Sequence, residues 1–572
     1  MKWVLKYLKS LRKRIAIGVS IKVIGTLAEL MIPFLLSYIL EHIIVTNDAR
    51  NIIFFGVLMA ICAVIAALGN IIANRMAAKT TMLFSTQMRK NLFSKTLHLS
   101  ARNTDRFTIP SLEARITSDT YNVQNFIGMM QRMGIRAPIL LLGGTAITMI
   151  MDRKLALVMI ATLPLIFIVV YSISRLGVPL YTRVQQSVDG MVRVVREDAQ
   201  GIRVIKALSK VDYENARYDK TNVTLKRNET RAGVIMGVVN PVMTLLMNIG
   251  IVAVIAVSAY FVSVGTSSAT TVIAFMQYFT LISMAMMSLS RMFVSYTKCA
   301  ASANRISLVM ESESELKICE DDGKGDKDLH ISFENVSFSY LGKKDNLKNI
   351  SFSLKKGETL GIIGATGSGK STLLRLLIRF YDADKGTVRI NGKDVRSYTP
   401  EELTSMFGVV FQNDFIYADT IEENIRFGRD ISYKDIENAT KIAQAYDFIT
   451  SFSNGFEHEV SAGGTNLSGG QRQRVLISRA IAGRPEILIL DDSSSALDYK
   501  TDASLRLALS NALPDSTIIT VAQRVSSVKN CDLILVIEDG EIIGCGKHEH
   551  LMKTCSEYKE ISDSQMGGAF LD

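Results

Sequence analysis

The 572-residue sequence has few cysteines and few charged residues. Its six cysteines are scattered, with no pair at metal-ligand spacing, so neither a cysteine-based metal site nor a disulfide framework is expected. Charged residues make up only 21% of the chain, against 48% hydrophobic residues. This composition is too apolar for a soluble protein of this length or for a disordered one. No short apolar core with a small-residue cleavage site follows the basic N-terminal stretch, so no removable signal peptide is expected.

Charge is absent from several long stretches of the first 300 residues. The longest stretch, between Arg231 and Arg291, contains no Asp, Glu, Lys or Arg. A helix of about 20 apolar residues is long enough to cross a bilayer. We therefore predict six membrane-spanning helices, near Ile15–Leu40, Ile52–Ala73, Ala137–Met151, Leu155–Ile173, Ala232–Val264 and Ser268–Leu289.

Basic residues are concentrated in alternate connections between these spans. Residues 75–136 hold ten Lys or Arg against three Asp or Glu, and residues 174–231 hold twelve against seven. The other connections carry only Arg50, Arg153 and Lys154 as bases. By the positive-inside rule, we expect a multi-pass protein of the cell membrane with both termini in the cytoplasm. Topology thus accounts for the net charge of +10, and no nucleic-acid partner is expected.

The two long cytoplasmic connections contain few Gly or Pro and keep an apolar period near 3.6 residues. They are predicted to be helices continuing out of the membrane, each pair joined by a transverse piece near Asn103–Pro110 and Leu208–Arg217. From Ile331, short β-branched strands alternate with helices, which indicates an α/β domain. The predicted organisation is an all-α transmembrane domain (1–300), a polar linker (301–330) and an α/β domain (331–572).

A glycine-rich loop of the form G-x-x-x-x-G-K-[ST] lies between a predicted strand, Glu358–Ile363, and a predicted helix, Ser371–Arg379. Glycines let backbone N–H groups close around phosphates, and the helix N-terminus adds its positive dipole end. We expect Lys370 to reach the β- and γ-phosphates of a bound nucleotide and the Ser371 hydroxyl to bind Mg²⁺. The predicted nucleotide-binding residues of this loop are Gly364, Ala365, Thr366, Gly367, Ser368, Gly369, Lys370, Ser371 and Thr372.

Two further motifs follow this phosphate loop. The apolar run Ile487–Leu490 ends in Asp491, typical of a buried parallel strand with an acid at its ligand-binding end, here a Mg²⁺ partner. The segment Leu467-Ser468-Gly469-Gly470-Gln471 ends twenty residues before Asp491 and is typical of a helix N-cap with free amides. With all three motifs in this order, the whole chain resembles the ATP-binding cassette (ABC) transporters, in which LSGGQ is the signature sequence.

The resemblance is to an exporter-type half-transporter, and it implies that two chains sandwich two ATP molecules. Each ATP lies between one chain's phosphate loop and the other's signature, so that Ser468, Gly469, Gly470 and Gln471 serve the partner's site. It further implies that Tyr340 stacks on adenine and that Gln412 contacts Mg²⁺ and the attacking water. The loop Ser495–Asp498 signals between the sites, and the two transverse pieces are coupling helices.

Two positions depart from the family's pattern. Asp492 stands where hydrolytic sites carry Glu, and Gln523 replaces the switch histidine. Aspartate is one methylene shorter, and glutamine carries no proton charge. We interpret Asp492, Gln523 and Gln412 as the catalytic residues of a slow, degenerate site in a heterodimer similar to bacterial multidrug exporters. The partner half-transporter should carry Glu after its Walker B aspartate and a switch His. Alternatives are a homodimeric lipid flippase or exporter, and a mainly regulatory ATP-holding subunit.

The expected cargo is a small amphipathic or hydrophobic compound, such as a drug, lipid or peptide. Polar residues inside apolar spans favour the bundle interior, and Glu29 is an intramembrane carboxylate. Glu29 could meet cationic substrates or form an interhelical hydrogen bond, and Asn240-Pro241 could be only a kink. The candidate substrate path comprises Glu29, Asn240, Asn248, Gln277 and Met284.

Overall fold

The computed structural model describes residues 2–44, 48–264, 269–313, 316–340, 342, 344–493 and 496–566. It divides the chain into two compact units: residues 1–98 with 107–312, and residues 99–106 with 313–572. Among the described residues, the first unit is helical throughout and every strand belongs to the second.

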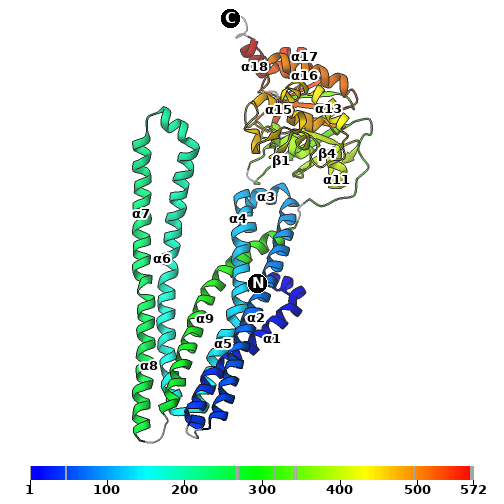
Figure 1. The fold of residues 1–572 in the computed structure, drawn as a ribbon. Coiled ribbons are helices and arrows are strands. Elements are labelled where there is room, and N and C mark those ends of the chain that lie inside the picture. The colour runs from blue at the N-terminus through cyan, green and yellow to red at the C-terminus, as the bar shows by residue number, and fades with distance from the viewer. Residues whose placement is uncertain are drawn as a thin grey trace. The chain divides into compact units, whose positions relative to one another are not determined.

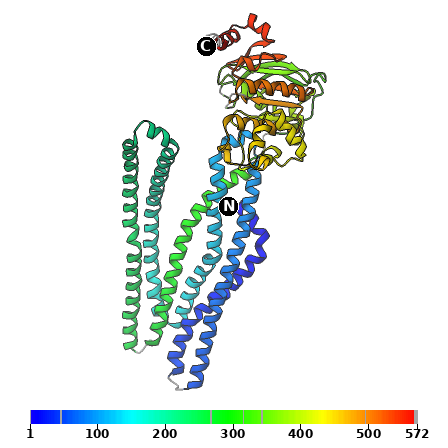
Figure 2. The same cartoon turned by 45° about the horizontal axis from the view of Figure 1, so that its top comes forward.

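Long helices make up the first unit (Figures 1 and 2). They are α1 (Lys2–Tyr38), continued by a π-helical stretch (Ile39–Ile43), α2 (Ala49–Leu97), α4 (Ile109–Ala114), a second π-helical stretch (Arg115–Asp119), α5 (Thr120–Met151), α6 (Arg153–Ala207), α7 (Val211–Gly237), α8 (Val239–Ser263) and α9 (Ala269–Met310). Helices α1, α5 and α6 continue through internal prolines.

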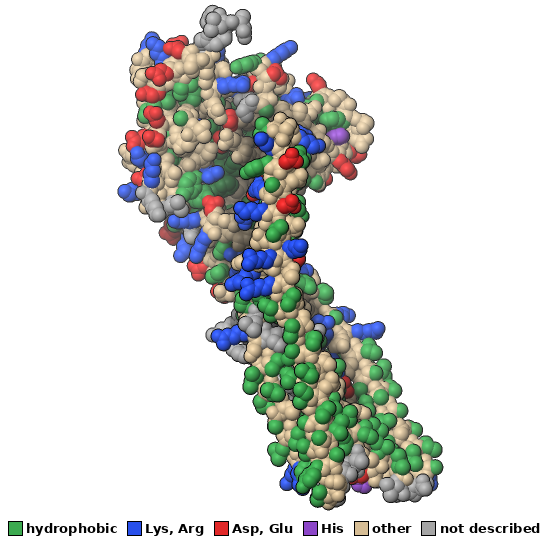
Figure 3. All heavy atoms as spheres, turned by 90° about the vertical axis from the view of Figure 1, so that its left-hand side faces the viewer, with side chains coloured by type: hydrophobic (Ala, Val, Ile, Leu, Met, Phe, Trp, Pro, Cys, Tyr) green, Lys and Arg blue, Asp and Glu red, His purple; other side chains and the backbone are tan. Residues whose placement is uncertain are grey.

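Five stretches of described residues are long and apolar enough to cross a membrane. They are Tyr7–Ile43, Ala49–Leu97, Ile109–Met151, Thr244–Phe261 and Thr270–Met310, and each corresponds to one predicted span. The remaining predicted span, Leu155–Ile173, lies within helix α6 and stays a prediction. Figure 3 shows apolar side chains over the lower part of the long helices, with Lys and Arg gathered higher up.

Helices α1, α2, α5 and α9 pack together, whereas α6 and α7 pair mainly with each other (Figures 1 and 2). Two glycines allow α1 and α2 to approach closely: a Cβ on Gly69 would lie 3.0 Å from the Cα of Gly25. Helices α1 and α9 are joined by Tyr278, whose buried hydroxyl donates to the carbonyl oxygen of Leu30 at 2.6 Å.

The predicted breaks in the cytoplasmic extensions differ from each other. The first contains a separate short helix, α3 (Ala101–Phe107). The second is only a turn between α6 and α7, in which Ser209 has a φ of 52°, so no separate transverse helix forms there. The predicted fifth span, Ala232–Val264, breaks at Val238 before the proline of Asn240-Pro241, and α9 continues to Met310, beyond the predicted linker boundary.

The second unit contains a six-stranded sheet in the order β12-β11-β3-β10-β9-β6, parallel except for β12. Its strands are β3 (Thr359–Ile363), β6 (Phe407–Val410), β9 (Ile487–Asp491), β10 (Thr517–Val521), β11 (Leu533–Glu538) and β12 (Glu541–Gly546). A four-stranded antiparallel sheet comprises β1 (Ile331–Phe338), β2 (Leu347–Leu354), β4 (Lys385–Ile390) and β5 (Lys393–Asp394), and β7 (Asp419–Thr420) pairs with β8 (Glu459–Val460).

Helices surround these sheets and contribute the apolar side chains of their cores. They are α10 (Lys370–Leu377), α11 (Pro400–Ser405), α12 (Ile421–Arg426), α13 (Tyr433–Ile442), α14 (Tyr446–Ser451), α15 (Gly469–Ile481), α16 (Tyr499–Ala512), α17 (His548–Thr554) and α18 (Ser556–Met566). Strands β3, β9 and β10 are neighbours, so their carboxyl ends bring three separate segments of the sequence to one edge of the sheet.

Candidate nucleotide-binding site

The glycine-rich loop connects β3 to α10, as the sequence predicts. Gly367 and Gly369 have φ values of 86° and 110°, in the region that favours glycine. The ammonium group of Lys370 lies across this loop and donates to the carbonyl oxygens of Gly364 and Ala365, at 2.8 and 2.7 Å. Burial lowers the pKa of Lys370, opposed by the nearby carboxylates of Asp491 and Asp492. The loop therefore carries a cation and ends at the N-terminus of α10, two features that favour phosphate binding.

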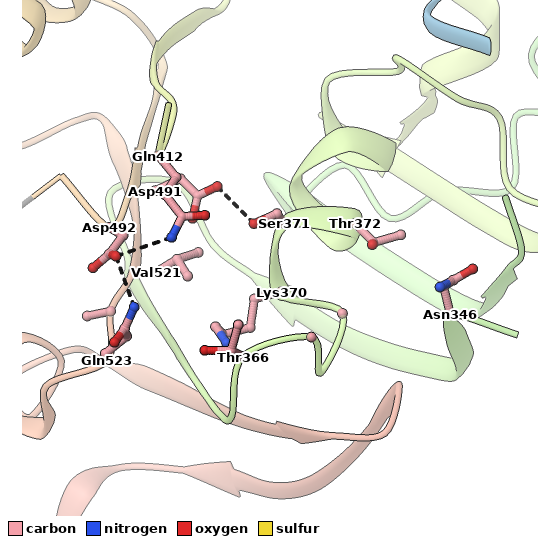
Figure 4. Close-up of a pocket in the computed structure, with 13 residues that line it drawn as sticks. Asn346, Thr366, Lys370, Ser371, Thr372, Gln412, Asp491, Asp492, Val521 and Gln523 are labelled. Carbon is pink, nitrogen blue, oxygen red and sulfur yellow. Dashed lines mark hydrogen bonds between the residues drawn. The ribbon is translucent and has the colours of Figure 1, made fainter. Parts of the chain in front are cut away.

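Asp491 ends β9 and is only 5% exposed. Its Oδ2 accepts a hydrogen bond from the Ser371 hydroxyl at 3.0 Å, which joins the end of β9 to the first turn of α10 (Figure 4). Burial raises the pKa of Asp491, and the bond from Ser371 acts in the opposite direction. A hydroxyl and a carboxylate thus stand together beside the phosphate loop.

The next residue, Asp492, has a φ of 51°, a left-handed conformation that turns the chain sharply after β9. Its Oδ2 accepts hydrogen bonds from two side-chain amides: Gln523 at 3.1 Å and Gln412 at 3.4 Å (Figure 4). The three residues come from the ends of β9, β10 and β6, which are neighbours in the sheet. The residues predicted to be catalytic therefore form one hydrogen-bonded group.

These groups line a cavity of about 280 Å³ (Figure 4). The cavity brings together ten residues that the sequence predicts: Thr366, Gly367, Gly369, Lys370, Ser371, Thr372, Gln412, Asp491, Asp492 and Gln523. Gly364, Ala365 and Ser368 belong to the same loop but do not line it. The sequence motifs miss three lining residues, Asn346, Val521 and Ala522, which lie before β2 and at the end of β10. No motif marks these three, because only the fold brings their segments to the loop.

Tyr340, expected to stack on adenine, is not part of the cavity wall. Its hydroxyl donates to Thr372 Oγ1 at 3.3 Å and accepts from Arg375 at 3.1 Å. Its ring packs edge-on against Phe338 and Tyr381. Tyr340 is therefore bonded to helix α10 at the margin of the loop, and its contact with adenine stays a prediction.

The signature segment begins helix α15. The Ser468 hydroxyl accepts from the Gln471 amide at 3.2 Å, and the Gln471 side chain accepts from the Ser468 amide at 2.9 Å, a reciprocal capping box. Gly469 and Gly470 form the first turn of this helix. None of the four signature residues lines the cavity built from this chain's own phosphate loop. In the nearby loop Ser495–Asp498, Ser495 lies outside the described residues.

Of the predicted substrate-path residues, Glu29 has a specific partner. Its carboxylate accepts two hydrogen bonds from the Arg136 guanidinium, at 2.6 and 3.2 Å. Asn248 in α8 and Gln277 in α9 are exposed, and Met284 is 55% exposed. The side chain of Asn240 lies outside the described residues. The structure thus provides the interhelical bond that was one of the two alternatives for Glu29.

Two family models match the chain. Residues 15–286 match the ABC transporter transmembrane region, and residues 347–495 match the ABC transporter model. The chain is 34% identical to the uncharacterised ABC transporter ATP-binding protein YfiB of Bacillus subtilis over 571 residues, covering 99% of both proteins. It is 31% identical to the uncharacterised ABC transporter ATP-binding protein Rv1273c of Mycobacterium tuberculosis, covering 98% of this chain and 97% of that protein.

A solved structure of a bacterial Atm1-family ABC exporter with ATP bound has the same fold, with a TM-score of 0.83. The two chains are 22% identical, and the match covers 97% of this chain and 98% of the other. A helical transmembrane domain joined to an α/β domain with this phosphate loop defines a membrane-bound, ATP-binding transport ATPase.

The chain belongs to the ABC transporter family. It is an exporter-type half-transporter, in which one transmembrane domain is fused to one nucleotide-binding domain, and ATP hydrolysis is coupled to transport. It is a multi-pass membrane protein. Because a half-transporter carries only one domain of each kind, it works as a dimer with a second half.

Proposed function

We propose that this chain is the degenerate-site half of a heterodimeric exporter, with its termini in the cytoplasm and its spans in the cell membrane. Its own phosphate loop holds ATP at a slow site, while its Ser468–Gln471 segment completes the fast site of a different chain. The partner carries Glu after its Walker B aspartate and a switch His. The cargo is a small amphipathic or hydrophobic compound.

The observation that carries this proposal is the bonding of Asp492. Both neighbouring side chains, Gln523 and Gln412, offer their amide N–H groups to the same carboxylate oxygen. These bonds occupy one carboxylate oxygen of Asp492 with two amide donors, whereas a general base must reach the water that attacks the γ-phosphate. Aspartate is also one methylene shorter than glutamate, and a misplacement of about 1 Å can lower a rate by roughly 10²-fold. Gln523, which stands in place of the histidine, is a neutral amide and supplies no base.

The position of the signature supports the division of labour between two sites. Ser468 and Gln471 bond each other at the start of α15 and stand apart from this chain's own cavity. A helix N-terminus with free amide groups attracts the phosphates of a nucleotide held by another chain. An intact signature beside an altered carboxylate favours a chain that completes one good site and one slow site.

We also propose that Mg²⁺ accompanies ATP, with Ser371, Asp491 and Gln412 facing it. The fit is chemical: the Ser371 hydroxyl and the Asp491 carboxylate are 3.0 Å apart at the loop, and both are hard oxygen ligands. Among the described residues there is no cluster of three His, Cys, Asp or Glu side chains. This suits Mg²⁺, which keeps water and phosphate oxygens as most of its ligands. When bound, the ion neutralises phosphate charge.

The choice between a heterodimer and a homodimer is tested with the chain purified alone. Its ATPase turnover is compared with that of the Lys370→Ala variant, while the oligomeric mass of the sample is recorded. We expect turnover near the Lys370→Ala background, which co-expression of the second half-transporter restores. Robust turnover by a homodimer would contradict the proposal and favour a homodimeric flippase or exporter.

The degenerate site is tested in the assembled transporter after the partner's phosphate-loop lysine has been replaced. Only this chain's own loop can then support turnover. The double variant Asp492→Glu, Gln523→His is expected to raise turnover about tenfold or more, because it restores both the reach and the proton chemistry. The matched control Asp492→Glu, Asp491→Asn should stay at background. If the double variant leaves turnover unchanged, these two residues do not limit the site.

A further inference from the structure

A layer of charged side chains crosses the helical unit between α1, α2 and α5, around the pair formed by Glu29 and Arg136. The ammonium group of Lys22 in α1 donates to the amide oxygens of Asn70 and Asn74 in α2, at 2.7 and 3.1 Å. Lys22 is only 3% exposed. Its electrostatic neighbours are Arg136, Glu29 and Arg132. Three cations and one carboxylate therefore share this layer.

The single carboxylate is already committed. Glu29 is bonded to two nitrogens of Arg136. Arg132 is exposed and donates from Nε to the carbonyl oxygen of Gly128, one turn away on its own helix, at 3.1 Å. In the part of the chain that the structure describes, no salt bridge involves Lys22 or Arg132. The layer thus carries two positive charges that no acidic side chain balances.

The depth of this layer follows from the helices. Glu29 lies 15 residues before Ile44, and Arg136 lies 15 residues before Met151, which places each about 22 Å from the far end of its span. The hydrocarbon core is about 30 Å thick, so this pair lies inside it, with Arg132 and Lys22 nearer the predicted cytoplasmic boundary. Charges at this depth are expensive in lipid and therefore face a polar interior or a substrate path.

The layer borders a strongly apolar region. Leu30 and Ala137, the residues after Glu29 and Arg136, belong to a buried cluster with Leu140, Tyr278 and Ile282. A cationic layer next to an apolar one suits a ligand with an acidic head and an apolar tail. Arginine is the preferred partner of carboxylate and phosphate groups, because its planar nitrogens match their oxygens.

We propose that Lys22, Arg132 and Arg136 form a binding site for the acidic headgroup of an amphipathic anion, a phosphate or carboxylate attached to an apolar tail. This deepens the proposed function, since it names the substrate class of the exporter and rests on that function. It replaces the expectation that Glu29 meets cationic substrates: Glu29 moderates the positive charge of the site and competes with the ligand for Arg136.

The test uses the assembled transporter in nanodiscs of phosphatidylcholine. Nucleotide-free binding is measured with dodecyl phosphate, dodecyltrimethylammonium and dodecylphosphocholine, which share one tail, and ATPase stimulation is then measured with the same three compounds. We expect dodecyl phosphate to bind and stimulate, and the cation to do neither. A separate series with phosphatidylglycerol in the nanodisc distinguishes a lipid source from a soluble one: competition with dodecyl phosphate indicates that a membrane lipid reaches the site.

Two variants with opposite signs separate a binding role from a structural one. Arg132→Gln should raise the half-saturating dodecyl phosphate concentration roughly tenfold or more, and Arg132→Lys should largely restore it. Glu29→Gln should lower that concentration, because it frees Arg136. A layer that only holds helices together would not gain anion affinity when Glu29 is neutralised. Arg153→Gln, the same change of charge at the other end of the spans, is the matched control and should have no effect.

The outcomes also separate this proposal from the exporter function. If all three compounds bind equally, or if Arg132→Gln and Arg153→Gln behave alike, the anion site is overturned even when ATP hydrolysis is normal. Anion-selective binding without Lys370-dependent ATPase activity would support the site and contradict the exporter function. Because binding is measured without nucleotide, it does not depend on which half hydrolyses ATP.

Discussion

The phenol hydroxyl of Tyr381 donates a hydrogen bond to the carboxylate of Asp105. Tyr381 follows helix α10 of the nucleotide-binding domain, whereas Asp105 lies in α3, the short helix that connects α2 to α4. Burial and the adjacent carboxylate both raise the pKa of Tyr381, so its hydroxyl keeps the proton for this bond. The Tyr381 ring also contacts the ring of Tyr340, with 5.1 Å between centroids. The Tyr381 side chain therefore contacts both Tyr340, the predicted adenine contact, and α3, the short helix between α2 and α4.

We predict that Tyr381→Phe weakens coupling between ATP hydrolysis and transport while ATP binding is retained. The variant keeps the ring that packs on Tyr340 but loses a hydrogen bond to a charged group, which contributes about 1.5–3 kcal/mol. The ratio of transport to ATP hydrolysis in proteoliposomes measures the effect and should fall. Tyr398→Phe is the matched control, because it also removes a buried phenol bond, to the carbonyl oxygen of Ile390, without touching α3. Equal loss of coupling in both variants would contradict this role.

The close approach of α1 and α2 yields a prediction about stability. Gly69→Leu places a side chain where a Cβ already lies 3.0 Å from the Gly25 backbone, so the two helices must separate. Overpacking of this kind typically costs about 1–3 kcal/mol. Gly56→Leu lies on the same helix with nothing within 4 Å, and it should be neutral or slightly stabilising through helix propensity. The measurement is the thermal unfolding temperature of each variant in nanodiscs. Gly69→Leu should lower this temperature, and Gly56→Leu should leave it unchanged or raise it slightly.

A buried histidine predicts how the stability of the nucleotide-binding domain depends on pH. His330 is 2% exposed, and its Nδ1 lies 2.7 Å from the Thr517 hydroxyl. Burial lowers the pKa of His330, although the carboxylate of Glu486 opposes this shift. The folded state therefore favours the neutral ring, and stability is lost as the pH falls below the unfolded pKa of about 6.5.

The loss is at most about 1.4 kcal/mol for each pH unit, and His330→Asn should remove it. Thermal unfolding of the full chain is followed between pH 7.5 and 5.5 for the wild type, His330→Asn and the exposed control His550→Asn. The His330 variant should show the flatter pH profile. Parallel profiles for all three proteins would show that His330 binds protons equally in the folded and unfolded states, which would contradict the prediction.

Most of the nucleotide site could be predicted from local sequence motifs. The contacts between distant segments could not, because they depend on how the helices pack. Short sequence motifs are enough to predict the phosphate loop, Asp491 and the N-terminal cap of α15. The pair of Glu29 and Arg136 spans 107 residues. The sequence analysis puts Arg136 at the membrane end of a helical cytoplasmic connection, and the structure includes it in α5 but also pairs it with Glu29, which no local pattern predicts. Lys22 drew no attention, because a lysine near the cytoplasmic end of a span satisfies the positive-inside rule. Only the helix packing makes it a buried neighbour of these residues.

The last prediction concerns Ser468, whose two possible roles are separable. Ser468→Ala removes one half of the capping box at the start of α15, which costs about 0.5–2 kcal/mol in stability. If Ser468 also binds the partner's nucleotide, the variant should abolish most ATP hydrolysis by the assembled dimer. Thr399→Ala removes the equivalent half of the capping box of α11, where Thr399 and Glu402 bond each other in the same way.

Both variants should lose similar stability, but only Ser468→Ala should lose ATPase activity. Turnover is measured in the assembled transporter well below the unfolding temperature, so that the shared loss of a helix cap does not enter the comparison. Retained hydrolysis in Ser468→Ala would contradict the assignment of this segment to the partner's site. Equal loss in both variants would trace the effect to folding of the domain. Ser468 does not line the cavity formed by its own chain's phosphate loop. A loss of ATPase activity in Ser468→Ala alone would therefore indicate that Ser468 contacts a nucleotide held by the second chain.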